Sequence, residues 1–302
     1  MTERHGLGDR PAFETDTAVE AIRDRCFAAT VTDRWNGLAG RPLGGYVLAV
    51  SLRAMQHSLP FPDLRVVSGF FLQPVDPGPV QIQVDAVRYG RRTASAEARL
   101  YQSGVEALRS MATFADLAAL SGQNLPLGRP PDLPAPMAAI DLHSGGPTPT
   151  ASIADRVEYR VDGALKPIAA STEGLRTRLW MRLKEGGGQD LLSLPFLVDA
   201  APPAVLELGA SGSTTVQLTA HIRRRSSSEW LACQATTQAV VDGYHDEDFE
   251  VWDEHGHLVA QSRQVAKLPS RDRLRLARAD NRTVQQDRRS PYHRPGSSRS
   301  FT

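Results

Sequence analysis

The chain has 302 residues, of which 41% are hydrophobic, and this is enough for two domains with sizeable cores. Its 35 basic and 34 acidic side chains nearly cancel, which excludes a chain built as a polycation for nucleic acid. The segment from Arg271 onward holds nine Arg and three Asp, so residues 1–270 keep 26 basic and 31 acidic groups. These counts predict a mildly acidic globular body followed by a basic tail.

Cysteine usage and hydropathy limit the compartment. Cys26 and Cys233 cannot form a disulfide framework, and neither belongs to a CxxC motif or a Cys/His cluster, so we expect no metal site. No apolar run approaches the roughly 20 residues of a membrane span. Residues 1–16 lack the apolar centre of a signal peptide. We therefore expect a cytoplasmic protein with no membrane span.

The first half of the chain predicts one helix followed by strands. Residues 44–57 are apolar and of helix length, and they end before Pro60. Strict alternation of apolar and polar residues over 80–86 and 94–100 indicates strands with one buried face. The strands expected after the helix are 65–73, 79–89, 93–103 and 105–116.

The second half repeats this order. A Pro/Gly-rich segment, residues 118–150, predicts a linker. Residues 175–183 alternate as a strand, and an apolar helix is expected over 190–201, with Pro195 favouring a start near Leu194. The strands expected after this helix are 213–224, 229–241, 247–253 and 257–268.

The repeated order indicates a pseudo-duplication, with residues 104–112 corresponding to 256–264 at an offset of 152. A helix wrapped by a curved antiparallel sheet is the hotdog architecture. The sequence thus predicts an α+β fold in which two tandem hotdog units form a pseudo-dimer. The expected boundaries are 1–117 for the N-terminal unit, 118–150 for the linker, 151–269 for the C-terminal unit and 270–302 for a basic, disordered tail.

Over roughly residues 30–268 the sequence resembles the double-hotdog bacterial acyl-CoA thioesterases, the medium- and long-chain type II enzymes. The order and spacing of several short segments carry the resemblance, namely 35–37, 44–46, 68–74, 87–95, 197–200, 214–224, 229–231 and 258–264. The resemblance implies hydrolysis of a fatty acyl-CoA to free acid and CoA without a cofactor. It also implies acyl-CoA as the ligand, no nucleic acid partner, and a homo-oligomer of double-hotdog chains.

The family's active site has an Asp on the second helix, a Thr or Ser on the next strand and a Gln on the last strand. These positions match Asp199, Thr215 and Gln264, although Thr214 is adjacent and a one-residue register shift would exchange the two threonines. Thioester hydrolysis needs a group that takes the proton of a water, and Asp199 in an apolar helix suits that role.

The resemblance also implies a substrate-binding role for Gly44, Gly45 and Tyr46. Amides at a helix start can hold an oxyanion, and the two glycines let a thioester carbonyl approach. Tyr46 stands where the family often has Gln. At offsets near 150 the first half has no counterpart of the three polar residues, so we expect one active site per chain, held mainly by the second half.

Two alternatives remain open. One is an enoyl-CoA hydratase, which would need an Asp/His pair, whereas His57 and His143 lie outside the matching segments. The other is a non-catalytic acyl-binding or interaction module.

Residues 242–249, with His245 among four acidic residues, are interpreted as an exposed acidic hairpin because they show no metal-ligand spacing.

Overall fold

The computed structural model describes residues 11–144, 152–163, 174–185 and 190–270. The first half contains one long helix, α2, with strands on either side of it in the sequence. Its elements are α1 (Ala12–Asp16), β1 (Glu20–Arg23), β2 (Cys26–Val31), η1 (Asp33–Trp35), α2 (Gly44–Ser58), β3 (Asp63–Phe71), β4 (Gly78–Tyr89), β5 (Thr93–Gln102) and β6 (Val105–Ala115).

The second half has the same plan around a shorter helix, α3, which ends ahead of Pro202 and Pro203. Its elements are β7 (Ile140–Asp141), η2 (Ser152–Asp155), β8 (Val157–Val161), β9 (Leu175–Leu183), α3 (Ser193–Ala200), η3 (Ala204–Leu208), β10 (Thr214–Ile222), β11 (Leu231–Thr237), β12 (Val240–Val241), β13 (Tyr244–Asp253) and β14 (Leu258–Lys267).

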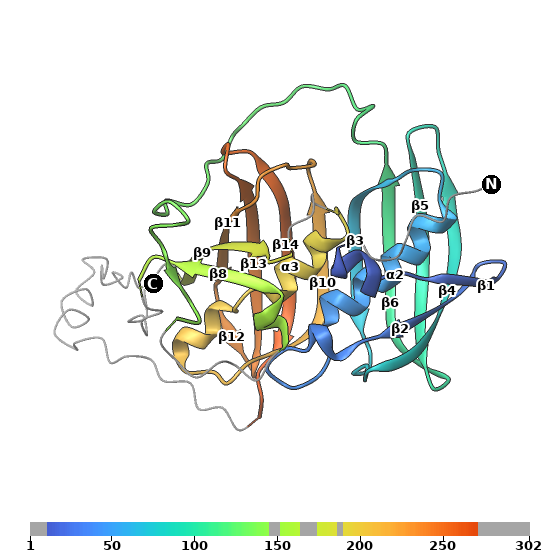
Figure 1. The fold of residues 1–302 in the computed structure, drawn as a ribbon, viewed down its shortest axis with the longest axis horizontal. Coiled ribbons are helices and arrows are strands. Elements are labelled where there is room, and N and C mark those ends of the chain that lie inside the picture. The colour runs from blue at the N-terminus through green and yellow to red at the C-terminus, as the bar shows by residue number, and fades with distance from the viewer. Residues whose placement is uncertain (1–10, 145–151, 164–173, 186–189, 271–302) are drawn as a thin grey trace, which may run out of the picture.

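The described strands form one antiparallel sheet in the order β1-β2-β4-β5-β6-β3-β10-β14-β13-β11-β9-β8-β7 (Figure 1). The order β4-β5-β6-β3 on one side of the centre is mirrored by β10-β14-β13-β11 on the other. The halves join where β3 pairs with β10, for example Gly69 opposite Leu218. This mirrored order confirms the predicted α+β double hotdog.

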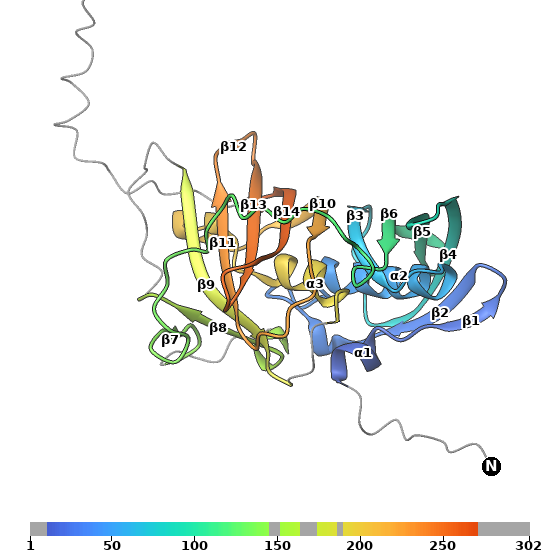
Figure 2. The same cartoon turned by 90° about the horizontal axis from the view of Figure 1, so that it is seen from above.

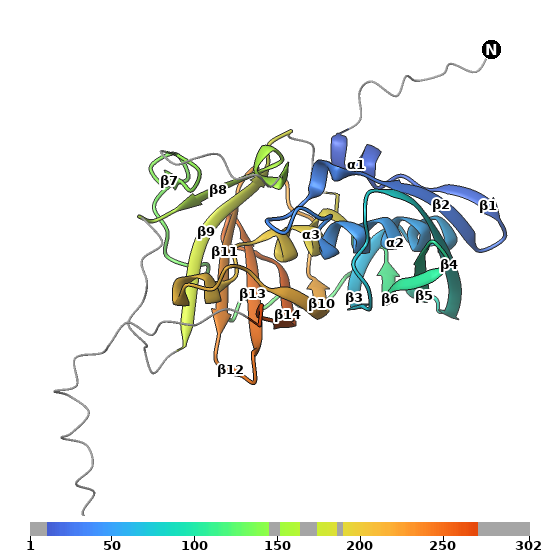
Figure 3. The ribbon, with the colours of Figure 1, turned by 90° about the horizontal axis from the view of Figure 1, so that it is seen from below.

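The two helices lie side by side against the same side of the sheet (Figures 2 and 3), and α2 contacts α3 directly. Their apolar residues fill the core: Leu48, Leu52 and Met55 of α2 and Phe196 of α3 have no exposed surface. The N-terminal end of α2 lies beside the C-terminal end of α3. The backbone groups at these helix ends are not all paired within the helices, so residues of both halves can meet there.

Strand register makes the duplication visible residue by residue. In the first half Ala112 pairs with Ala96 on one side and Val67 on the other. In the second half Gln264 pairs with Glu247 and Leu218 in the same way. The two copies thus differ at buried positions, where the first half has two alanines and the second has two polar residues.

Both expected helices are confirmed within a few residues, as are the strands expected after each of them. The strands β1, β2 and β8 are not among the predicted ones. All four residues of β1 are exposed, β2 alternates poorly, and β8 is buried at four of five positions, so none carries a clear period of two.

The expected linker has more structure than its composition indicates. Ile140 of β7 pairs with Val161 of β8, and Trp180 Nε1 donates to the carbonyl of Pro134 at 2.8 Å. Leu133 and Ala139 pack on a cluster formed with Trp180, Trp230 and Trp252. The segment is therefore held on the second half, while the four domain boundaries stay a prediction and the tail from residue 271 lies outside the described residues.

Candidate functional site

A cavity of about 820 Å³ opens between the two halves next to the helix contact. Most of its wall is apolar and comes from the loop before α2, the end of β3, and the segments on either side of η3. Its lining includes Leu38, Leu43, Gly44, Val47, Phe71, Leu72, Leu108, Leu142, Ile153, Tyr159, Leu206, Asp199, Thr215 and Gln264. All three residues expected to be catalytic therefore meet at one wall of this cavity.

Asp199 lies in the last turn of α3, partly exposed at the cavity wall. Its Oδ2 accepts a hydrogen bond from the Gly45 amide at 2.7 Å, and its Oδ1 lies 3.0 Å from Thr215 Oγ1. Burial raises the pKa of the Asp199 carboxyl, while these two contacts act in the opposite direction because they favour the anion. The result is a carboxyl held in a fixed orientation that can accept a proton.

Gly45 of α2 packs tightly against α3. A Cβ at this position would lie 2.7 Å from Asp199 Cβ and 2.9 Å from Phe196 Cα. Both distances are shorter than a non-bonded contact between two carbon atoms allows. Only glycine lets the first turn of α2 reach the Asp199 carboxylate. Gly45 is thus brought to the site, but its amide holds Asp199 and is not free for an oxyanion.

Gly44 lines the cavity and Gly45 does not. Among the described residues, the Gly44 amide forms none of the hydrogen bonds that the structure contains. Of the two amides expected to hold an oxyanion, only that of Gly44 lies at the cavity without a protein acceptor.

Thr214 and Thr215 both line the cavity, and a β-bulge brings Thr215 to Asp199. Along β10, Leu218 and Ala220 are buried, and strict alternation would turn Val216 inward and Thr215 outward. The register with β14 shifts between Thr215 and Gln217, so Thr215 pairs with the buried Ala266 and faces inward. The open choice between the two threonines is thereby answered in geometric terms: Thr215 contacts Asp199.

Gln264 connects Thr215 to a second carboxyl, that of the buried Glu247. Its Oε1 lies 3.2 Å from Thr215 Oγ1, and its Nε2 donates to Glu247 Oε1 at 2.9 Å. Glu247 Oε2 accepts the amide of Ala204 at 3.0 Å. Burial raises the pKa of Glu247 to about 8, and the negative charge of Asp199 acts in the same direction.

Glu247 is the site residue that sequence reasoning missed. The hairpin predicted for residues 242–249 is present, since β12 pairs with β13, but its predicted exposure is wrong for His245 and Glu247, which are both 2% exposed. The signal was present: Phe249 and Val251 are apolar, and a period of two backward from them places Glu247 and His245 on the buried face. Among the described residues no three His, Cys, Asp or Glu side chains converge as a metal site would require.

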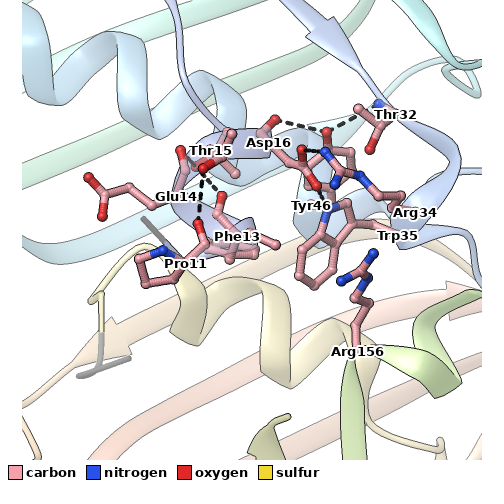
Figure 4. A network of polar contacts seen from close by, with 12 residues as sticks. Pro11, Phe13, Glu14, Thr15, Asp16, Thr32, Arg34, Trp35, Tyr46 and Arg156 are labelled. Atoms are coloured by element: carbon pink, nitrogen blue, oxygen red, sulfur yellow. Dashed lines mark hydrogen bonds and ion pairs between the residues drawn. The ribbon is translucent and has the colours of Figure 1, made fainter. Parts of the chain in front are cut away.

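The structure corrects the expectation for Tyr46, which lies in the core and not in the cavity wall. Its hydroxyl donates to the Asp16 carbonyl at 2.9 Å and accepts the Thr32 amide at 3.2 Å, and its ring stacks on Trp35 (Figure 4). Trp35 in turn donates to the Asp16 carboxylate at 2.8 Å, and Arg34 pairs with the same carboxylate. Tyr46 thus fastens α1 to α2.

His143 lines the same cavity, although it lies outside the segments that resemble the thioesterase family. Its ring meets that of Tyr159 edge to face.

No helix within the described ranges is long and apolar enough to span a bilayer.

Two family matches cover most of the chain. Residues 31–115 match the acyl-CoA thioesterase N-terminal domain, and residues 129–268 match the acyl-CoA thioesterase C-terminal domain. The chain belongs to the acyl-CoA thioesterase family. It is therefore a thioester hydrolase by family, and the C-terminal match begins inside the segment predicted as a linker.

Individual proteins resemble this chain in sequence and in fold. The chain is 25% identical to a putative thioesterase II from Thermobifida fusca, over 87% of this chain and all of that one, with a TM-score of 0.77. A protein with a hot dog fold from Alicyclobacillus acidocaldarius is 22% identical over 86% of this chain and 99% of its own, with a TM-score of 0.75, and supports the fold alone. An uncharacterized protein of Mycobacterium tuberculosis is 25% identical over 82% of this chain and 92% of its own length.

Proposed function

We propose that this thioester hydrolase cleaves fatty acyl-CoA to free acid and CoA, with Asp199 as the base that activates water. The observation that carries the proposal is the position of the Asp199 carboxyl, fixed by the Gly45 amide and Thr215 at the wall of an apolar cavity. An acyl chain gains free energy by leaving water for such a cavity, at about 25 cal/mol per Å² of buried apolar surface.

The proposed reaction is a direct attack of water on the thioester carbonyl. Ionised Asp199 takes a proton from the water as the new C–O bond forms, and the Gly44 amide donates to the developing oxyanion. When the C–S bond breaks, the protonated Asp199 returns that proton to the thiolate of CoA. The carboxylate is regenerated, and no cofactor is needed for the atoms to balance.

Thiol release from a chain-length series of acyl-CoA tests this proposal. The expected result is turnover by the purified chain and its loss, by about 10²- to 10⁴-fold in kcat, in Asp199→Asn, which keeps the shape of the side chain and removes the base. Binding of acyl-CoA without thiol release by the unmutated chain would refute hydrolysis and favour the acyl-binding alternative.

One observation favours a second candidate, the hydration of enoyl-CoA. His143 and Asp199 line the same cavity, and an Asp/His pair is the chemistry that hydration uses. Loss of the enoyl absorbance without thiol release would support this reaction in place of hydrolysis.

A cytoplasmic location stays a prediction.

We also propose that copies of the chain assemble into a homo-oligomer. Phe70 and Met111 are about half exposed, and Val265 is 40% exposed, on strands at the centre of the fused sheet. Apolar side chains gathered on one surface favour association. Light scattering tests this, since a monomer would show the chain mass of 32.9 kDa.

A further inference from the structure

Glu247 is a buried carboxyl that the proposed hydrolysis does not use. Thr215 Oγ1 lies 3.0 Å from Asp199 Oδ1 and 3.2 Å from Gln264 Oε1, so two acceptors face one hydroxyl. A threonine hydroxyl carries a single hydrogen and can donate only once. If Asp199 is ionised and Gln264 keeps this orientation, one of the two contacts holds no hydrogen.

Two arrangements give every contact a hydrogen. In the first, Asp199 carries a proton and donates to Thr215, Thr215 donates to Gln264 Oε1, and Gln264 Nε2 donates to ionised Glu247. In the second, the Gln264 amide is turned over. Protonated Glu247 then donates to Gln264 Oε1, Gln264 Nε2 donates to Thr215, and Thr215 donates to ionised Asp199.

Both arrangements contain one proton on the pair of carboxyls. With no proton, an oxygen faces an oxygen somewhere along the chain. With two protons, one of them meets another donor, because Glu247 Oε2 already accepts the Ala204 amide and Asp199 Oδ2 already accepts the Gly45 amide. Buried polar groups left without partners are costly, so the one-proton states are favoured.

We propose that Asp199 and Glu247 share a single proton through Thr215 and Gln264, and that Glu247 is a positioning residue which keeps Asp199 ionised by holding that proton itself. The catalytic part of this statement rests on the proposed hydrolysis, whereas the sharing of the proton does not. Burial raises the pKa of both carboxyls, and the hydrogen-bonded chain between them couples their titrations.

Other charged groups near the pair have partners of their own. On β13, Asp246 faces the outer side and pairs with Arg263 of β14. His245 lies on the buried face, and burial lowers the pKa of its ring, which favours the neutral form. On η3, Glu207 accepts the Thr177 hydroxyl of β9 at 2.7 Å. Among the described residues, no cation is paired with Asp199 or Glu247.

Infrared difference spectroscopy at pH 7 tests the shared proton without any assay of activity. The stretching band of protonated carboxyls is compared between the unmutated protein, Asp199→Asn, Glu247→Gln and the double variant. Each amide can replace the proton-bearing carboxyl in the chain of donors, so each single variant is expected to lose one carboxyl band. The double variant is expected to lose no more than either single variant. Glu207 contributes equally to every spectrum and cancels.

A band lost only in Glu247→Gln, or a double variant that loses two bands, would show that the carboxyls titrate independently and would overturn the proposal. Glu207→Gln is the matched control for a buried carboxyl outside the chain. It is expected to leave the shared band in place and to change only the signal of Glu207 itself.

Kinetics test the positioning role. The unmutated protein is expected to lose kcat at alkaline pH as the shared proton leaves, whereas Glu247→Gln keeps kcat within about threefold and shows no alkaline loss. Glu247→Leu, which cannot donate, is expected to lower kcat about 10- to 100-fold with little change in KM. An unchanged alkaline loss in Glu247→Gln would overturn the role. Absence of thiol release from the unmutated protein would instead refute the proposed hydrolysis, and the infrared result would still stand.

Discussion

Replacing Gly45 by alanine perturbs both the helix contact and the proposed base. The added Cβ would lie 2.7 Å from Asp199 Cβ and 2.9 Å from both Phe196 Cα and the Pro195 carbonyl oxygen. Two of these three are backbone atoms of α3, which cannot rotate away. The helices must therefore separate by several tenths of an ångström, and the 2.7 Å hydrogen bond from the Gly45 amide to Asp199 is lengthened.

The expected cost follows from three terms. Overpacking a tight contact costs about 1–3 kcal/mol. Loss of the hydrogen bond from the Gly45 amide to the Asp199 carboxylate would cost about 1.5–3 kcal/mol, and its weakening costs less. Alanine returns up to about 1 kcal/mol through its higher helix propensity. A net loss of about 2–4 kcal/mol lowers the melting temperature by roughly 5–10 °C in a chain of this size.

Activity is expected to fall with stability but through a separate cause. The Gly45 amide favours the Asp199 anion, so its loss raises the pKa of Asp199 further. A general base must be ionised, and the acid side of the profile of kcat/KM therefore moves to higher pH. Calorimetry and thiol release from acyl-CoA between pH 5 and pH 9 measure the two effects.

The neighbouring glycine supplies the control for stability. The three atoms nearest to a Cβ at Gly44 would all belong to the ring of Phe71, the closest at 2.8 Å, and that side chain can turn aside. Gly44→Ala should therefore keep a melting temperature near that of the unmutated protein. If Gly45→Ala melts no lower than Gly44→Ala and keeps the unmutated pH profile, the helix contact does not hold Asp199 as argued.

Three further predictions concern the site and the segment between the halves. Because burial raises the pKa of Glu247 from 4.5 to about 8, folded protein holds a proton that unfolded protein releases, and stability falls as pH rises through this window. Glu247→Gln should remove that fall, so its melting temperature relative to the unmutated protein should rise from pH 5 to pH 8; a constant difference would contradict this. Thr215→Val should lower kcat about 10- to 100-fold in steady-state thiol release, whereas Thr219→Val, on the outer face of the same strand, should change kcat less than about twofold. Trp252→Ala should destabilise the protein by about 3 kcal/mol and expose residues 120–139 to limited proteolysis, with cleavage elsewhere refuting the packing of that segment on the tryptophan cluster.

The alternation of residues 80–86 and 94–100 was enough to predict β4 and β5, because a strand with one buried face repeats every two residues. The lengths of the apolar segments and their proline stops predicted α2 and α3 in the same way. Repetition of this order along the chain predicted two copies of one unit. Such periodic, local signals are contained in the sequence itself.

The register of strands in the folded sheet decided the rest. Thr215 faces Asp199 only because a bulge shifts β10 against β14, and no local residue pattern marks that bulge. Glu247 reads as one acidic residue among several until the pairing of β13 with β14 sets it beside Gln264. The sequence marks Gly45 only as the start of a helix, and its contact with α3 is visible only in the folded structure.

The sequence by itself determined the fold class and the duplication, since periodicity is a property of the chain, and its resemblance to a known family supplied Asp199, Thr215 and Gln264 as candidates. Only the tertiary structure decided which groups touch. The distances among Asp199, Thr215, Gln264 and Glu247 arise from four elements, α3, β10, β14 and β13, and hydrogen bonding depends on their relative positions to within a few tenths of an ångström.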